Sequence, residues 1–136
     1  KAEDKQMQVQ MKISTIAQIT DVTDCLLQQL RQWNIGEEKQ MDIRLCIMEA
    51  VQNALLYGCP QNQNAASVEI CWQCTPQGFS FTVTDEGPGV PKSLQHQTWD
   101  MISLEEHGRG LLLMQAILDE VTFNETGNSL SGWLRW

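Results

Sequence analysis

Basic residues are scarce in this sequence of 136 residues. It has 9 lysines and arginines against 17 aspartates and glutamates, which gives a formal net charge of -8 and a pI near 4.6. A protein that binds nucleic acid or an anionic membrane needs clustered cations to displace counterions from phosphates, and no such cluster is present. The charge balance therefore excludes a general role on those surfaces, although it permits a small local anion site.

Long apolar runs are missing as well. No segment approaches the roughly 20 consecutive apolar residues that span a bilayer, and no charged leader precedes an apolar core and a cleavage site. We therefore expect a soluble cytoplasmic protein that does not enter a membrane. Nothing suggests a linker between two domains, and 42% hydrophobic residues suffice for one core, so we expect a single domain over residues 1–136.

Side chains for a conventional metal or redox centre are few. The two histidines, His96 and His107, have no nearby Cys/His set that would complete a metal site. The five cysteines are an odd number scattered through apolar segments, which fits reduced thiols better than a disulfide framework. Cys71 and Cys74 have a CxxC spacing, but on a predicted strand two residues three apart point to opposite faces. Neither set of residues therefore predicts a metal or redox site.

The periodicity of apolar residues predicts both strands and helices. A period of two predicts strands over 7–13, 67–74, 79–84, 120–124 and 130–136. A helical period, closed or opened by glycines, predicts helices over 20–33, 37–57 and 111–118. Hairpins mixed with helices in this order predict an α+β fold, an open sheet with helices on one face.

The predicted helix over 37–57 has an unusual, narrow polar stripe that contains Asp42, Cys46, Glu49 and Asn53. Glu49 and Asn53 are four residues apart, so their side chains project from the same side of the helix, among apolar neighbours. A carboxylate and a carboxamide lose solvation there unless a polar group meets them. They are either an exposed surface pair without a role or oxygen ligands for a hard cation such as Mg²⁺.

The strand in "FTVTDEGPGV" ends abruptly in Asp85, followed by Gly87 and Gly89. Taken alone, the stretch is either a surface turn or the rim of a ligand site that presents one carboxylate. It is not a dinucleotide-binding fingerprint, because it leads into a proline and a loop with no third glycine at the required place.

A second glycine pair precedes the last predicted helix. Gly108 and Gly110 flank Arg109 immediately before an apolar helical run. Unpaired backbone N–H groups at a helix N-terminus attract phosphate, glycine permits close approach, and an arginine can bind phosphate oxygens. No Gly-Lys-Ser/Thr follows, so the segment is not a Walker loop.

The stretches "MEAVQNALLYG", "TDEGPGV" and "HGRGLLLMQAILDEV", in this order, resemble the N box and the two glycine boxes of the GHKL (Bergerat-fold) ATPases, which include gyrase, histidine kinases and MutL. The compact length and the form "GRGLLLM…ILDEV" are most similar to the RsbW-like anti-sigma factor serine/threonine kinases. The resemblance covers nearly the whole chain. It implies a histidine-kinase-like ATPase fold, a two-layer α+β sandwich whose mixed, mostly antiparallel sheet has three helices on one face.

The resemblance also implies ATP and Mg²⁺ as cofactors. Asn53 would coordinate the Mg²⁺ that bridges the ATP phosphates, and Glu49 would be the general base that activates a serine hydroxyl or a water. Asp85 would accept a hydrogen bond from the adenine amino group, which guanine replaces with a carbonyl acceptor.

The remaining implied roles belong to the glycine boxes and their surroundings. Gly87 and Gly89 would let the backbone pass the base closely, and Gly108, Arg109 and Gly110 would border the phosphates. Residues from about 91 to 107 would form a mobile lid. Ser129 is the nearest candidate for a hydroxyl that helps to hold adenine.

For function, the resemblance implies an ATP-dependent serine/threonine kinase that phosphorylates a STAS-type anti-sigma factor antagonist on serine. It also implies binding to a sigma factor and pairing into a homodimer. One alternative is a non-catalytic ATP-binding module that switches partners, and another is an ATPase domain excised from a larger signalling protein such as a histidine kinase. The presence of Glu49 favours catalysis, because pure binding needs no base.

Overall fold

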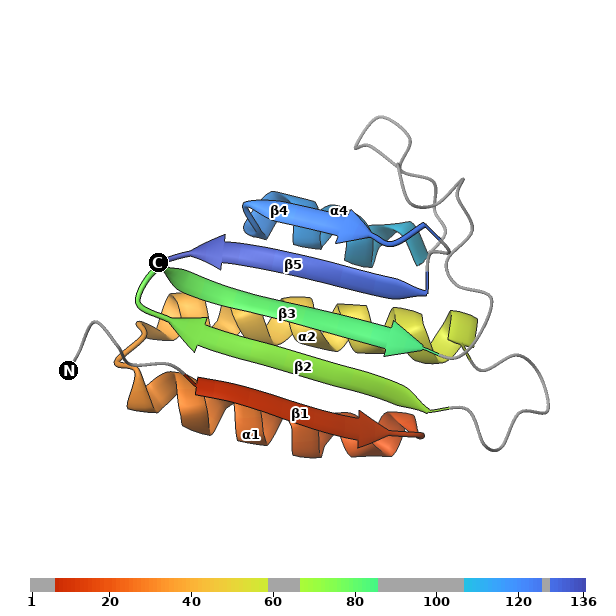
Figure 1. Cartoon of the computed structure of the whole chain (residues 1–136), viewed down its shortest axis with the longest axis horizontal. Coiled ribbons are helices and arrows are strands. Elements are labelled where there is room, and N and C mark those ends of the chain that lie inside the picture. The colour runs from red at the N-terminus through yellow and green to blue at the C-terminus, as the bar shows by residue number, and fades with distance from the viewer. Residues whose placement is uncertain (1–6, 59–66, 86–106, 126–127) are drawn as a thin grey trace.

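The computed structural model describes residues 7–58, 67–85, 107–125 and 128–136. The elements in chain order are β1 (Met7–Ile13), the 3₁₀ helix η2 (Ile16–Gln18), α1 (Ile19–Gln32), α2 (Glu37–Gly58), β2 (Val68–Thr75), β3 (Gly78–Asp85), α4 (His107–Ile117), β4 (Glu120–Phe123) and β5 (Ser129–Arg135) (Figure 1). Their bounds agree closely with the predicted ones except at α4, which begins before the glycine pair rather than after it. The short η2 was not predicted.

The described strands form one five-stranded sheet in the order β1-β2-β3-β5-β4. Every pair of neighbours is antiparallel, so the sheet is antiparallel throughout these strands rather than mixed. The helices α1, α2 and α4 all lie on the same side of it (Figure 1). The structure is thus the predicted α+β two-layer sandwich with three helices on one face.

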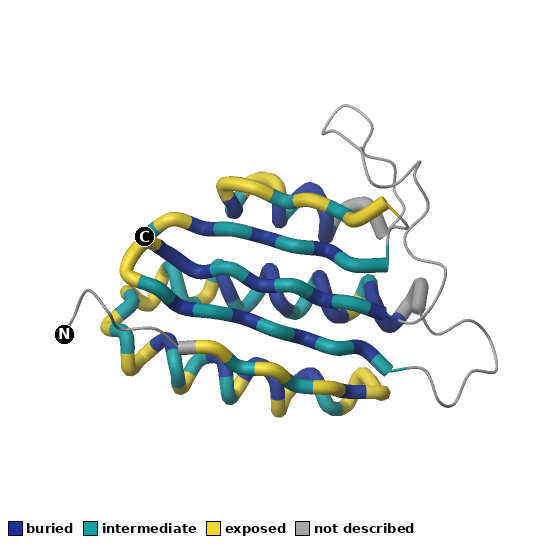
Figure 2. Tube along the Cα trace, in the orientation of Figure 1, coloured by how far each residue is buried: buried dark blue, intermediate teal, exposed yellow. Residues whose placement is uncertain are grey.

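Residues alternate between the two faces of the sheet, and Figure 2 shows this alternation along β2, β3 and β5. On the face away from the helices, hydroxyls pair across strands: the Thr82 and Ser131 oxygens are 3.0 Å apart, and those of Thr84 and Ser129 are 2.9 Å apart. Cys74 is buried on the helix side while Cys71 is only half-buried. The two thiols therefore point to opposite faces, as predicted.

The core lies between the sheet and the two longer helices. On α2, the predicted apolar face is fully buried at Ile43, Ile47 and Val51. Trp72 on β2 is also buried, and its indole N–H donates a hydrogen bond of 2.9 Å to Gln29 Oε1 on α1, which fixes this helix to the sheet. None of the helices in the described ranges is both long and apolar enough to cross a membrane.

Helix α1 is followed by a left-handed residue, which is Asn34 with φ of 59° rather than a glycine. The Asn34 N–H donates a hydrogen bond to Arg31 O, and the Ile35 N–H donates one to Leu30 O. These two hydrogen bonds define a Schellman motif. Asparagine tolerates this conformation better than other side-chain-bearing residues. The chain then turns directly into α2, whose face carries the candidate site residues.

Candidate functional site

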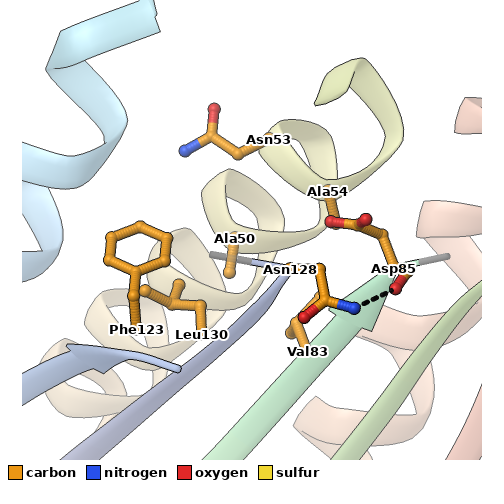
Figure 3. Close-up of a pocket in the computed structure, with 8 residues that line it drawn as sticks. All are labelled: Ala50, Asn53, Ala54, Val83, Asp85, Phe123, Asn128 and Leu130. Carbon is orange, nitrogen blue, oxygen red and sulfur yellow. Dashed lines mark hydrogen bonds between the residues drawn. The ribbon is translucent and has the colours of Figure 1, made fainter. Parts of the chain in front are cut away.

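A pocket opens between α2 and the ends of β3 and β5 (Figure 3). Its lining comes from α2, from strands β3 and β5, from the last residue of β4 and from the residue before β5. The lining residues are Ala50, Asn53, Ala54, Val83, Asp85, Phe123, Asn128 and Leu130. The pocket therefore brings together two predicted residues, Asn53 and Asp85, that are distant in the sequence.

Asp85 is the last residue of β3 and lies at the polar end of the pocket. It faces the helix layer, like Val83 two residues earlier, because strand residues alternate. Only 4% of Asp85 is exposed, and among the described residues no other aspartate or glutamate is buried. A carboxylate removed from water in this way discriminates strongly between hydrogen-bond donors and acceptors that enter the pocket.

Asn128 holds the backbone of Asp85 in place. The Asp85 N–H donates to Asn128 O at 2.8 Å, and the Asn128 side chain donates to Asp85 O at 3.1 Å (Figure 3). The Asn128 carboxamide oxygen in turn accepts a bond of 2.7 Å from Asn124. Asn128 was not among the predicted site residues, and its contacts make it part of the framework that sets the direction of the Asp85 carboxylate.

Ser129 was predicted to contact a ligand, but the structure places it elsewhere. It pairs with Thr84 on the face of the sheet away from the helices, and it is absent from the pocket lining. Leu130 is buried under the helices, so its neighbour Ser129 must point outward and Asn128 must point inward. The alternation around Leu130 was therefore the sequence signal that identifies Asn128.

The rest of the pocket wall is apolar. Val83 and Leu130 form its floor on the sheet, Phe123 lies at one side, and Ala50 and Ala54 face it from α2 (Figure 3). Because alanine is small, the helix leaves room above the strands where a larger side chain would fill the space. An apolar slot with polar groups at one end is a setting for a flat ring that carries hydrogen-bonding groups on its edge.

Glu49 and Asn53 lie one turn apart on α2, and both are half-buried. The Asn53 carboxamide points out of the mouth of the pocket, away from Val83 and Leu130 (Figure 3). Burial raises the pKa of the Glu49 carboxyl above its usual value. Glu49 therefore holds a proton more tightly than an exposed glutamate, which is the property of a stronger base.

Cys46 belongs to the same predicted stripe but is not exposed. Only 1% of its surface is accessible, and burial, followed by the charges of Asp42 and Glu49, raises the pKa of its thiol to about 12. The thiolate is the reactive form, so this cysteine is inert at neutral pH. The polar stripe of α2 is therefore shorter than predicted, because Cys46 packs in the core beneath it.

Helix α4 brings the second glycine pair to α2. It begins at His107, so Gly108, Arg109 and Gly110 form its first turn instead of preceding it. The first N–H groups of a helix have no partner within the helix and are available to an anion. Gly110 is buried against Glu49, which places that carboxylate beside the same turn. The predicted roles of Gly87, Gly89 and the segment 91–106 fall on residues outside the described ranges.

Within the described ranges, no three His, Cys, Asp or Glu side chains gather closely enough to hold a metal ion. The oxygen atoms that Asn53 and Glu49 present from one side of α2 suit a hard cation. Mg²⁺ commonly binds to one or two protein oxygens together with phosphates and water. The residues present thus fit an ion that arrives with phosphates better than a resident ion held in a protein cage.

The chain matches the histidine kinase-like ATPase domain family over residues 13–134, and it belongs to that family. Among individual proteins it is similar to the serine-protein kinase RsbW of Staphylococcus epidermidis, with 24% identity, and to RsbW of Staphylococcus aureus, with 26% identity. Each match covers 66% of this chain and 62% of the relative, so the chain spans less than two thirds of these relatives.

The fold also resembles solved histidine kinase structures. The nucleotide-free catalytic domain of the histidine kinase ThkA superposes with a TM-score of 0.56 at 15% sequence identity. The superposition covers 93% of this chain and 97% of the other. A second nucleotide-free form of that domain gives the same TM-score at 16% identity. At this level of identity the likeness concerns the fold alone.

Proposed function

We propose that this chain is an ATP-dependent protein serine/threonine kinase that phosphorylates a STAS-type anti-sigma factor antagonist on serine and also binds a sigma factor. The observation that carries the proposal is the position of Glu49. Its half-buried carboxylate lies one turn from Asn53 and directly beside the first turn of α4. A group that only holds a nucleotide needs no base there, whereas transfer to a hydroxyl does.

The pocket supports binding of the adenine of ATP. The flat ring would lie between the apolar strands and the two alanines of α2, with its amino group donating to the Asp85 carboxylate. The triphosphate would then run past Asn53 towards the N–H groups of α4, including those of Gly108 and Gly110. Mg²⁺ bound by Asn53 and the phosphates would neutralise phosphate charge.

Glu49 would accept the proton of the attacking serine hydroxyl. Its raised pKa favours this role, since a carboxylate with greater proton affinity takes a proton more readily. In phosphoryl transfer the protein mainly positions groups and balances charge, so one base, one metal ligand and a backbone cradle for the phosphates nearly suffice. The fit to RsbW-like kinases, rather than to an ATPase that uses water, rests on the similarity to the two staphylococcal proteins.

Incubation with labelled ATP, Mg²⁺ and a purified STAS-type antagonist tests the proposal. Label is expected on a serine of the antagonist, and Glu49→Gln is expected to slow its transfer by about 10²- to 10⁴-fold, because the base is lost. Binding of ATP to Glu49→Gln is expected to persist, since the substitution leaves the pocket residues unchanged.

Glu69→Gln is the matched control, because Glu69 lies on the face of the sheet away from the helices, where its carboxylate accepts a hydrogen bond from Gln10. The alternative, an ATP-binding module that switches partners without phosphate transfer, predicts a different pattern. In that case ATP binds and the antagonist associates, yet no label moves and Glu49→Gln behaves like wild type.

We also propose that the chain acts in the cytoplasm as a homodimer that pairs through β1. Within the described residues β1 pairs only with β2, so its other edge presents unpaired backbone groups that a second copy could meet. Sedimentation equilibrium is expected to show a dimer that Gln10→Lys weakens, because an edge lysine opposes strand pairing. Thr122→Lys on the opposite edge strand β4 is the control. A monomer at every concentration would contradict the assignment.

A further inference from the structure

Gly110 leaves space that the side chain of Glu49 fills. A Cβ atom added at position 110 would lie 2.6 Å from Glu49 Oε2 and 3.3 Å from both Glu49 Cβ and Glu49 Cδ. Among the described residues, and apart from the chain neighbours and the backbone of α4 itself, these are the three nearest heavy atoms, so Glu49 makes the closest contacts from another element. Gly110 is buried and Glu49 is half-buried. The contact therefore joins the α2 stripe to the first turn of α4.

The backbone of α4 does not itself call for glycine at this position. Gly110 lies inside the helix and its φ is not in the left-handed region. Glycine is a poor helix residue there, because it loses more conformational freedom than alanine when the helix forms. A reason other than backbone geometry must therefore favour glycine at position 110. The nearest atoms, which belong to Glu49, indicate that this reason is the space taken by the Glu49 side chain.

We propose that Gly110 is the positioning residue for Glu49, and that its missing side chain seats the carboxylate against the turn that faces the phosphates. The inference rests on the proposed function, in which Glu49 is the base. It gives Gly110 a role beyond close approach of phosphate. The Glu49 carboxylate and the first turn of α4 are held in contact. Any shift of this turn therefore moves the carboxylate with it.

Gly110→Ala should preserve the fold and displace the base. The closest atom to the added methyl is the far end of a flexible side chain, which can swing away, and the two 3.3 Å contacts need only small adjustments. We expect an unchanged unfolding temperature, a small change in the Kd for ATP, and a fall in kcat of about 100-fold from displacement of the reacting group. A glycine needed only for phosphate approach would give the reverse, a weakened Kd with little specific effect on kcat.

A rescue experiment separates these roles. Glu49→Asp alone should lower kcat, because its carboxylate is one methylene further from the reacting hydroxyl. In the Gly110→Ala background the shorter side chain avoids the added methyl, so the double variant should be at least as active as Gly110→Ala alone. A double variant slower than both single variants would overturn the proposal. Gly36→Ala is the matched control, since no atom lies within 4 Å of the position of its Cβ.

A spectroscopic measurement on the ligand-free protein does not depend on kinase activity. The carboxyl carbon NMR signal of Glu49, assigned by its loss in Glu49→Gln, should shift in Gly110→Ala and remain in place in Gly36→Ala. An unmoved signal in Gly110→Ala refutes the positioning role. If the signal moves but wild type transfers no phosphate to any antagonist, the proposed kinase function fails while the contact between Gly110 and Glu49 stands.

Discussion

Asp85→Asn is expected to weaken ATP binding by about 10- to 100-fold, the effect of losing a hydrogen bond to a charged group. The carboxylate only accepts hydrogen bonds, whereas the carboxamide also presents an N–H₂ group that opposes the amino group of adenine. The replacement has nearly the same shape, and both backbone bonds to Asn128 are kept. Calorimetric titration with ATP measures the change in Kd, and thermal unfolding checks that the fold is retained.

Asp119→Asn is the matched control for this substitution. Asp119 is exposed and accepts a hydrogen bond from the Arg135 N–H, so the change removes a charge outside the pocket. Its Kd for ATP should equal that of wild type. A second comparison uses GTP, because the asparagine amide can donate to the guanine carbonyl and should reduce the preference for ATP. Unchanged affinity for both nucleotides in Asp85→Asn would show that Asp85 does not bind the base and only ends strand β3.

Local periodicity explains why most elements could be predicted. The buried face of α2, with Ile43 and Ile47, follows from spacing along a single helix, and so does the position of Glu49 one turn before Asn53. The opposite orientations of Cys71 and Cys74 follow from the period of two in β2. Each of these predictions needs only residues within one element, which is why the sequence sufficed.

Contacts between elements that are distant in the sequence were harder to predict. The position of Asp85 at a strand end could be predicted, but its bond to Asn128 depends on the register between β3 and β5. The resemblance implied Ser129 as the hydroxyl that helps to hold adenine, whereas the alternation fixed by the buried Leu130 turns Asn128 towards the pocket. The contact between Gly110 and Glu49 depends on how α4 packs on α2, which no local pattern in either helix specifies.

Helix ends were the other source of error. Glycines predict the helix boundaries in this sequence, yet the left-handed residue after α1 is Asn34, and the glycines of "HGRGLLLM" lie inside α4. In α4, packing against α2 compensates for the low helix propensity of Gly108 and Gly110. This difference matters for the site, because it puts the glycine pair in the first turn of the helix, where N–H groups have no partner within the helix, rather than in a loop before it.

Gly132→Ala is expected to destabilise the protein by about 1–3 kcal/mol through overpacking. Gly132 lies opposite Phe81 in the β3–β5 ladder, and an added Cβ would lie 2.4 and 2.6 Å from two atoms of its ring and 2.8 Å from Leu118 Cδ1. Phe81 is 3% exposed and its ring centroid is 6.1 Å from that of Phe79, so the ring has little room to move. Chemical denaturation measures the loss, which Phe81→Leu should partly restore in the double variant.

The same substitution also tests how the pocket depends on the sheet beneath it. Strands β3 and β5 carry Asp85 and Leu130, so separating them at Gly132 should disturb the pocket floor and weaken ATP binding together with stability. Gly36→Ala should leave ATP binding unchanged, because Gly36 lies outside the pocket and its Cβ would meet open space. Gly132→Ala therefore lowers both quantities, whereas Asp85→Asn lowers affinity alone. A Gly132→Ala protein that unfolds at the wild-type denaturant concentration would show that the Phe81 ring can yield, and that the close contact at Gly132 does not fix the spacing of the strands.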